Sequence, residues 1–320
     1  MANIKRRVPS VVIVVPNYNG ESIKFRKRSI LSECLKSIRK LDYKNYKVVV
    51  GDGNSPDRSE EVARRFGVDF FRNRVNLGPI KNNNTTIRYV IRRYNPDYIL
   101  WFNNDALVTE RDFLDKLVEV AESDKLIAIE GCRLLYPDGR IQHAGVTEGF
   151  RNRGRFDRDR GEWNMVEDIY AVTAAVCLYR VSALRKIGLF DDTYNTSCED
   201  VDLCMRAKEH GFRVIYNGKA SAIHLEGFTV KSGDRSVKTR DFLFRQEDYM
   251  YLSLRYGGIR QRMRGVKILL GRCIFVLEGE RDGRSGAVMV FRSGIPNNII
   301  LTLKAFAGAY RRYRDLTGNN

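Results

Sequence analysis

The sequence is poor in the residues that build disulfide-bonded proteins and zinc fingers. It has only three histidines in 320 residues, and its cysteines form neither a C-x-x-C pair nor a zinc-type spacing with a histidine. The six cysteines are Cys34, Cys132, Cys177, Cys198, Cys204 and Cys273. Such scattered cysteines are typical of buried free thiols in a reducing compartment. A disulfide framework and a structural zinc site are therefore excluded.

Long apolar runs are also missing. No stretch approaches the about 20 apolar residues that a membrane-spanning helix needs. The run Val11–Val15 is too short for the core of a signal peptide, and it leads directly into Pro16. We therefore expect a cytoplasmic protein whose only membrane contact would be peripheral, on the inner face.

Acidic residues are scarce relative to basic ones, and the formal net charge is +17. Residues 231–320 hold 18 Lys and Arg against 8 Asp and Glu, and residues 1–40 hold 10 against 2. An excess of this size indicates a nucleic acid, a phosphate-bearing substrate or an anionic membrane surface as partner. No aromatic-basic recognition signature accompanies the charge, which also avoids the motif-bearing middle of the chain. We therefore expect no nucleic acid partner.

Apolar patterns predict an α/β fold with a mainly parallel, Rossmann-like sheet flanked by helices. Continuous apolar runs indicate buried strands, and apolar residues at helical spacing follow them. The strands are expected at 11–15, 48–50, 68–71 and 98–102, and the helices at 30–41, 59–66, 85–93 and 113–121. The texture changes near residue 230. We expect a domain over residues 1–229 and a basic, helical C-terminal extension over 230–320.

Polar clusters follow three of the predicted strands. They are Pro16-Asn-Tyr-Asn-Gly20, Asp52-Gly-Asn-Ser-Pro-Asp57 and Asn103-Asn-Asp105. In such sheets ligands bind beyond the carboxyl ends of the strands, so these turns predict one binding site. The first turn has no G-x-G-x-x-G and no Walker lysine loop, which counts against a dehydrogenase or a P-loop enzyme.

Three carboxylates, Glu199, Asp200 and Asp202, stand at the start of a further expected helix. Acidic residues in a first turn favour the helix dipole, which accounts for one or two of them. Helical spacing places Asp200 and Asp202 about 200° apart, so both cannot face one substrate atom. We expect Asp202 to orient a neighbour such as Arg206.

In this order, these motifs resemble the family 2 glycosyltransferases of the GT-A fold, in particular the rhamnosyltransferase-like branch. The resemblance covers about residues 10–228. It rests on Val14–Gly20, Asp52–Ser59, Asn76-Leu-Gly78 with Asn83-Asn84, Asn103–Val108, Gly188-Leu-Phe-Asp-Asp192 and Glu199–Arg206.

The resemblance implies an inverting transfer from a UDP- or dTDP-sugar to the hydroxyl of a glycan or lipid-linked acceptor, in the assembly of a surface polysaccharide, glycolipid or glycoprotein glycan. Asp52 would accept a hydrogen bond from the nucleobase. The implied nucleotide-binding residues are Pro16, Asn17, Tyr18, Asn19, Asp52, Asn76, Asn83 and Asn104.

The resemblance also implies Mg²⁺ or Mn²⁺, held by Asp105 and His224, and a general base, Asp200, supported by Glu199 and Asp202. From the residues alone, Asp52 and Asp105 could instead form turns, and His224 could be a core imidazole in a strand.

Three positions depart from the family pattern: Gly53 stands where Asn is usual, Pro79 where an aromatic residue is usual, and Asn82 where a small residue is usual. They leave open a catalytically silent nucleotide-sugar-binding protein.

Overall fold

The computed structural model describes residues 7–226, 235–258, 262 and 295–317, and the chain divides into two units. Unit 1 comprises Met1–Asp192 and Glu199–Gly233, and unit 2 comprises Thr193–Cys198 and Asp234–Asn320. The predicted boundary between residues 229 and 230, most of the basic extension and Cys273 lie outside the described residues. The other five cysteines are free thiols, and all but Cys198 are buried.

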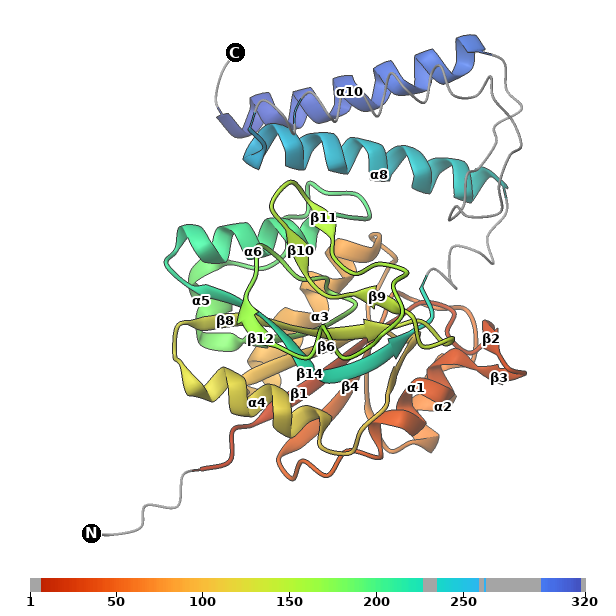
Figure 1. Ribbon diagram of the computed structural model, residues 1–320. Helices are drawn as coiled ribbons and strands as arrows, with labels where there is room; N and C mark the ends of the chain where they lie inside the picture. Colours follow the sequence, from red (N-terminus) through yellow and green to blue (C-terminus); the bar gives the residue numbers. More distant parts are fainter. Residues whose placement is uncertain (1–6, 227–234, 259–261, 263–294, 318–320) are drawn as a thin grey trace. The chain divides into compact units, whose positions relative to one another are not determined.

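Unit 1 alternates strands and helices (Figure 1). Its strands are β1 (Val11–Asn17), β2 (Lys24–Phe25), β3 (Arg28–Ser29), β4 (Tyr46–Asp52), β5 (Asp69–Arg72), β6 (Tyr98–Phe102), β7 (Ala106–Val108), β8 (Ile127–Leu135), β9 (Ile141–His143), β10 (Val146–Thr147), β11 (Arg151–Asn152), β12 (Val166–Asp168), β13 (Val176–Arg180) and β14 (Arg213–His224). Its helices are α1 (Ile30–Ile38), α2 (Ser59–Arg65), α3 (Pro79–Tyr94), α4 (Phe113–Ser123), α5 (Val181–Ile187) and α6 (Glu199–Glu209).

The central sheet has the order β12-β14-β8-β13-β6-β1-β4-β5. The strands β5, β4, β1 and β6 pair in parallel, as the apolar runs predict. β13 runs antiparallel to both β6 and β8, so the sheet is mixed. A strand that is buried on both faces has the same continuous apolar pattern in either direction, which is why the sequence did not reveal this reversal.

Helices cover both faces of the sheet (Figure 1). On one face α1, α2 and α4 share an apolar core with side chains such as Ile13 and Leu100. Burying each such side chain contributes about 1.5–3 kcal/mol. On the other face α3 lies close to β4: a Cβ at Gly51 would come within 2.4 Å of Thr86 Cγ2. Glycine at position 51 therefore permits this helix to approach the strand.

The helix α3 begins six residues before the predicted start at Thr85. Pro79 occupies its first turn, where the missing N–H costs nothing. Asn82 and Asn84, which have low helix propensity, concealed this turn in the sequence. The helix ends at Asn95 in the left-handed conformation, directly before Pro96, in agreement with the predicted stop.

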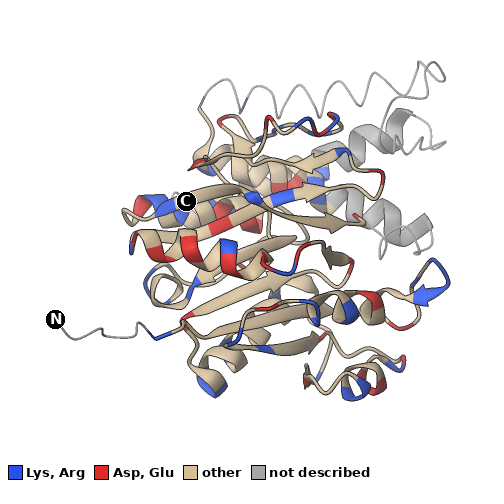
Figure 2. Cartoon of the chain, turned by 60° about the horizontal axis from the view of Figure 1, so that its bottom comes forward, with Lys and Arg blue, Asp and Glu red and all other residues tan. Residues whose placement is uncertain are grey.

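The cationic segment Lys24–Arg28 forms a small hairpin of β2 and β3 between the first polar turn and α1. Its four cations are exposed, whereas the strands in the middle of the sheet carry few charges (Figure 2). Arg26 and Lys27 form the turn with φ of 48° and 67°, a conformation that Asn and Gly adopt more readily.

Unit 2 contains α8 (Arg235–Tyr256) and α10 (Ile295–Thr317), which pack against each other, together with the segment Thr193–Cys198. A Cβ at Gly308 would lie 2.4 Å from Glu247 Oε1, so a small residue on α10 permits the close approach to α8. Among the described residues, no helix has both the length and the apolar character to span a bilayer.

Candidate active site

A chain of hydrogen bonds joins the carboxyl ends of β1 and β4 to the turn after β6. Asn104 Nδ2 donates to Asn17 Oδ1 at 2.9 Å, and Asn17 Nδ2 donates to Asp52 Oδ1 at 2.7 Å. These three residues are all nearly buried. The three polar turns that the sequence placed at one edge of the sheet are therefore connected through their side chains.

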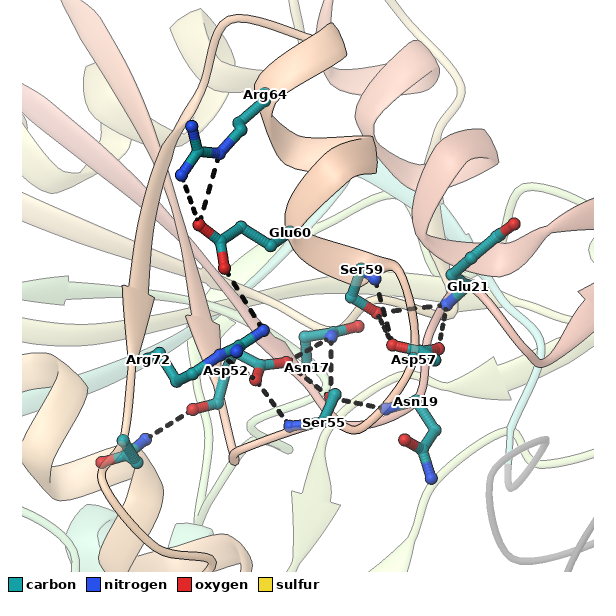
Figure 3. A network of polar contacts seen from close by, with 11 residues as sticks. Asn17, Asn19, Glu21, Asp52, Ser55, Asp57, Ser59, Glu60, Arg64 and Arg72 are labelled. Carbon is teal, nitrogen blue, oxygen red and sulfur yellow. Dashed lines mark hydrogen bonds and ion pairs between the residues drawn. The ribbon is translucent and has the colours of Figure 1, made fainter.

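Asp52 is the centre of this chain (Figure 3). It has no exposed surface, and its carboxylate also accepts hydrogen bonds from the backbone N–H and the hydroxyl of Ser55, at 2.7 and 2.6 Å. Arg72 Nε lies 3.7 Å from Asp52 Oδ2, and Arg72 also contacts Glu60 at 3.3 Å. This arrangement supplies the buried charge with partners, as a buried carboxylate requires.

The first polar turn is shaped by the loop that follows Asp52. The backbone N–H of Asn19 donates to Ser55 Oγ at 2.8 Å, and the N–H of Glu21 donates to Asp57 Oδ2 at 2.9 Å (Figure 3). A Cβ at Gly20 would lie 2.1 Å from Asn17 Oδ1. Glycine is therefore required there for the amide of Asn17 to reach Asp52.

The remaining predicted nucleotide-binding residues lie around this cluster with different exposure. Pro16 and Asn83 are half-buried, whereas Tyr18 and Asn76 are exposed. The ring of Tyr18 is 40% exposed, which leaves a flat aromatic face accessible to a ligand. Asn76 Oδ1 accepts hydrogen bonds from the N–H of Gly78 and from Asn82.

Two departures from the family pattern explain each other. A Cβ at Gly53 would lie 2.9 Å from Asn82 Nδ2, so the Asn82 side chain fills the space beside this glycine. Asn82 also donates to Asn76 Oδ1 at 2.8 Å and accepts from the Leu77 N–H at 3.1 Å. Asn82 therefore holds the loop before α3, and Gly53 leaves the room that it needs.

Asp105 and His224 meet where β14 pairs with β7. His224 Nε2 lies 3.0 Å from Asp105 Oδ1, and His224 Nδ1 lies 2.7 Å from Gln142 Oε1. Gln142 Nε2 donates to the carbonyl of His224, which identifies Oε1 as the acceptor and Nδ1 as the protonated nitrogen. Although burial disfavours the charged imidazole, the carboxylate of Asp105 raises the pKa of His224. His224 is thus not an isolated core imidazole.

This pair fits a divalent cation that binds together with a diphosphate. Gln142 fixes the ring so that Nε2 faces Asp105, which is the support a ligating imidazole usually receives. In the part of the chain that is described, no group of three or more His, Cys, Asp or Glu side chains could hold a metal. A hard cation commonly takes one or two protein ligands and completes its shell with phosphate oxygens and water. Asp105 and His224 could serve in this way.

Asp200 lies in the first turn of α6. Its Oδ2 accepts a hydrogen bond from the N–H of Ala174 at 3.0 Å, and its Oδ1 accepts one from the N–H of Val201 at 2.8 Å. Burial raises the pKa of Asp200 above its ordinary value, and the two backbone donors oppose part of that rise. A carboxylate that is held in place and made more basic suits proton abstraction.

Asp202 is fully buried and accepts a hydrogen bond from Arg206 Nε at 2.7 Å. Arg206 in turn donates to the carbonyls of Ile187 and Leu189, both at 2.6 Å. Asp202 thus lies in a different set of contacts from Asp200 and holds the loop after α5 through Arg206. Glu199 is the first residue of α6 and is half-buried.

The backbone around Ala174 connects the metal pair's loop to Asp200. Next to the Ala174 N–H that binds Asp200, the carbonyl of Ala175 accepts a hydrogen bond from the N–H of Asn103 at 2.9 Å. On the other side, the N–H of Thr173 donates to His143 Nε2 at 3.3 Å. Burial lowers the pKa of His143 to about 4, so it stays neutral and can accept this bond. The residues 173–175 therefore bridge the two halves of the site.

Sequence reasoning missed Gln142, His143 and the turn at 173–175. A single amide has no recognisable spacing, and backbone donors are independent of residue type. The only available signal was the pair Gln142-His143 itself, a polar doublet in a buried strand, and its direction cannot be assigned without the fold.

A mixed sheet with polar turns at the carboxyl ends of its parallel strands, and an aspartate–histidine pair beside them, defines this protein as a GT-A fold. The model of glycosyl transferase family 2 matches residues 12–188. The chain therefore belongs to glycosyl transferase family 2, as its motifs predicted.

Named relatives agree with the predicted branch. An O-antigen biosynthesis protein, RfbC, from Myxococcus xanthus is 25% identical over 231 residues, which are 69% of this chain and 18% of that protein. This chain thus spans less than a fifth of that relative. The rhamnosyltransferase WbbL from Escherichia coli is 27% identical over 200 residues, 57% of this chain and 74% of that enzyme. The rhamnosyltransferase-like branch is thereby confirmed.

A solved structure confirms the fold. The mannosyltransferase PcManGT from Pyrobaculum calidifontis, in complex with GDP-Man and Mn²⁺, superposes with a TM-score of 0.53 at 15% identity. The superposition covers 98% of this chain and 77% of that one.

Proposed function

We propose that this protein is a metal-dependent, inverting glycosyltransferase that moves a sugar from a UDP- or dTDP-sugar to an acceptor hydroxyl. The observation that carries the proposal is the meeting of two groups of residues through the segment 173–175. One group is the Asp52–Asn17–Asn104 chain with Asp105 and His224 beside it, and the other is Asp200. A donor site and a base are thus joined by backbone contacts within one unit.

The donor nucleotide would bind at the ends of β1 and β4. In the proposed arrangement Asp52 accepts the imide N–H of a uracil or thymine base, and the exposed ring of Tyr18 covers the base. Asn17 and Ser55 already orient the Asp52 carboxylate through hydrogen bonds. Because those contacts exist without a ligand, the carboxylate would lose little conformational freedom on binding.

The donor diphosphate would lie beside Asp105 and His224. When bound, Mg²⁺ or Mn²⁺ supplies positive charge that neutralises the departing diphosphate. Asp105 and His224 would hold this cation, and Gln142 would keep the Nε2 lone pair of His224 directed at it. Cation binding requires an unprotonated Nε2, so we expect it to release a proton from the His224–Asp105 pair.

In the proposed reaction, the oxygen of an acceptor hydroxyl attacks the anomeric carbon from the side opposite the diphosphate. A new C–O bond forms while the bond to the diphosphate oxygen breaks, and its electron pair leaves with the nucleoside diphosphate. Asp200 takes the hydroxyl proton, which its raised pKa favours. Attack from the opposite side inverts the configuration at the anomeric carbon.

The acceptor would be a glycan or a lipid-linked sugar, as in the assembly of a surface polysaccharide. The exposed cations of the β2–β3 hairpin are suited to the phosphates of such a lipid or of the membrane around it, each contributing about 1 kcal/mol near an anionic bilayer. A cytoplasmic location with peripheral membrane contact stays part of this proposal.

The alternative of a catalytically silent nucleotide-sugar binder loses one of its reasons. Gly53 and Asn82 are compensating changes that preserve packing beside the nucleotide loop, and Pro79 suits the first turn of α3. None of the three touches Asp200 or the Asp105–His224 pair in the contacts that define the site.

A thermal-shift screen of nucleotide sugars tests the donor site. A ligand at 100 times its Kd stabilises a protein by about 2.7 kcal/mol, which is easily measured. We expect UDP- or dTDP-sugars to stabilise the wild type more strongly with Mn²⁺ or Mg²⁺, and the added effect of metal to vanish in Asp105→Asn. If no nucleotide sugar stabilises the wild type, or if metal makes no difference, the proposal is wrong.

A further inference from the structure

Asp248 on α8 is fully buried and surrounded by hydrogen-bond donors from a distant segment of the chain. Its carboxylate accepts three consecutive backbone N–H groups, those of Asn195 at 2.9 Å, Thr196 at 2.9 Å and Ser197 at 3.0 Å. The side-chain amide of Asn195 adds a fourth bond at 3.0 Å. Successive backbone N–H groups around one anion form a nest, and bonds to a charged acceptor are stronger than neutral ones.

Arg312 on α10 completes this arrangement within unit 2. Its Nη1 donates to the Thr193 carbonyl at 2.5 Å and to Asp248 Oδ1 at 3.1 Å, and its guanidinium stacks 4.9 Å from the ring of Tyr251. The ring of Tyr194 lies 5.0 Å from the same tyrosine. The two C-terminal helices therefore hold the segment 193–198 through its backbone at both ends.

This segment leads directly into the proposed base. The chain leaves unit 1 after Asp192 and returns to it at Glu199, one residue before Asp200. Cys198, at the junction, has a φ of 70°, which is uncommon for a residue other than glycine. A strained junction persists where the residues around it are held by other contacts, and here Asp248 binds the three residues that precede Cys198.

We infer that Asp248, supported by Arg312, is a positioning residue that fixes the backbone leading into α6 and thereby the place of Asp200. The inference rests on the proposed function for its catalytic part. It assigns the C-terminal helices a role in the transfer step in addition to any contact with acceptor or membrane. The donor nucleotide, which would bind at the ends of β1 and β4, should be unaffected.

The test compares three full-length variants. Asp248→Asn keeps the size of the side chain but turns an amide N–H toward backbone donors. Arg312→Lys is a milder second variant that keeps the charge and loses the planar group. Glu247→Gln is the matched control, because Glu247 is adjacent on α8 and contacts Arg312 at 3.3 Å, whereas the printed contacts of the 195–197 amides go to Asp248.

Hydrogen–deuterium exchange tests the anchoring itself. We expect the amides of residues 195–197 to be protected in the wild type and in Glu247→Gln, and to exchange at least tenfold faster in Asp248→Asn. Equal protection in all proteins would overturn the inference, whatever reaction the protein catalyses.

Steady-state kinetics test the catalytic part. Since a misplacement of about 1 Å can cost about 100-fold in rate, we expect kcat to fall about 10- to 100-fold in Asp248→Asn and less in Arg312→Lys. The donor KM and the Kd for the nucleotide should stay at their wild-type values. An unchanged kcat, or an equal loss of nucleotide binding and turnover, overturns the positioning role. A wild type that transfers no sugar would instead contradict the proposed function and remove only this catalytic part.

Discussion

Replacing Gly53 by alanine should destabilise unit 1 because of one neighbouring side chain. The new Cβ would lie 2.9 Å from Asn82 Nδ2, closer than such atoms approach in proteins. The next nearest atoms, Asn17 O at 3.5 Å and Tyr18 Cδ2 at 3.6 Å, are at ordinary contact distance. The strain therefore depends on Asn82 alone, which makes the effect separable.

The magnitude follows from the hydrogen bonds that Asn82 would lose on moving away. It makes two, to Asn76 Oδ1 and from the Leu77 N–H, and each contributes about 1 kcal/mol. We expect Gly53→Ala to lower the free energy of unfolding by about 1–2 kcal/mol. In an Asn82→Ala background the same change should cost nothing, or stabilise by about 0.4–1 kcal/mol through the unfolded state. The coupling energy between the two sites should be about 2 kcal/mol.

Urea unfolding followed by tryptophan fluorescence measures this cycle. Both tryptophans, Trp101 and Trp163, belong to unit 1, so the signal reports on the unit that carries the substitutions. If Gly53→Ala has the same cost with and without Asn82, the proposed compensation between the two positions is wrong.

Three further predictions concern the buried polar groups around the site. Because the pKa of His143 is about 4 in the folded protein and about 6.5 unfolded, its stabilising effect is present above pH 6.5 and lost as the pH falls toward 4; urea titrations should show a loss between pH 8 and pH 5 that is about 2 kcal/mol smaller in His143→Gln than in the wild type. Gln142→Leu should weaken Mn²⁺ binding in the presence of nucleotide by about 10- to 100-fold, measured calorimetrically, because His224 loses its orienting partner; an unchanged affinity would argue against metal ligation by His224. Asp202→Asn should lower the free energy of unfolding by about 3 kcal/mol, since it leaves a buried guanidinium unpaired; a loss below 1 kcal/mol would contradict the role assigned to this pair.

Much of the parallel half of the sheet could be predicted from the sequence, because β1, β4 and β6 are continuous apolar runs closed by polar turns. Asp52 and Asp105 could be placed for the same reason: the ends of neighbouring parallel strands meet at one edge. The antiparallel direction of β13 could not, since burial on both faces gives the same pattern in either direction.

The second half of the site depends on contacts that leave no pattern. Asp200 is held by the backbone N–H of Ala174, and His224 by the amide of Gln142, from segments 26 and 82 residues away. The anchor at Asp248 is still less visible, because its donors are backbone groups. Only Asp202 could be separated from Asp200 beforehand, since helical geometry alone places the two on different faces.

The most direct test of the proposed function is sugar transfer by Asp200→Asn with the identified donor and Mn²⁺. General bases contribute about 10²- to 10⁴-fold, so kcat should fall by about that factor while nucleotide affinity and the unfolding curve stay unchanged. In the wild type, kcat should decline as the pH falls through the raised pKa of Asp200, because the protonated carboxyl cannot accept the hydroxyl proton. Undiminished turnover in the folded variant would contradict the assignment of Asp200 as the base.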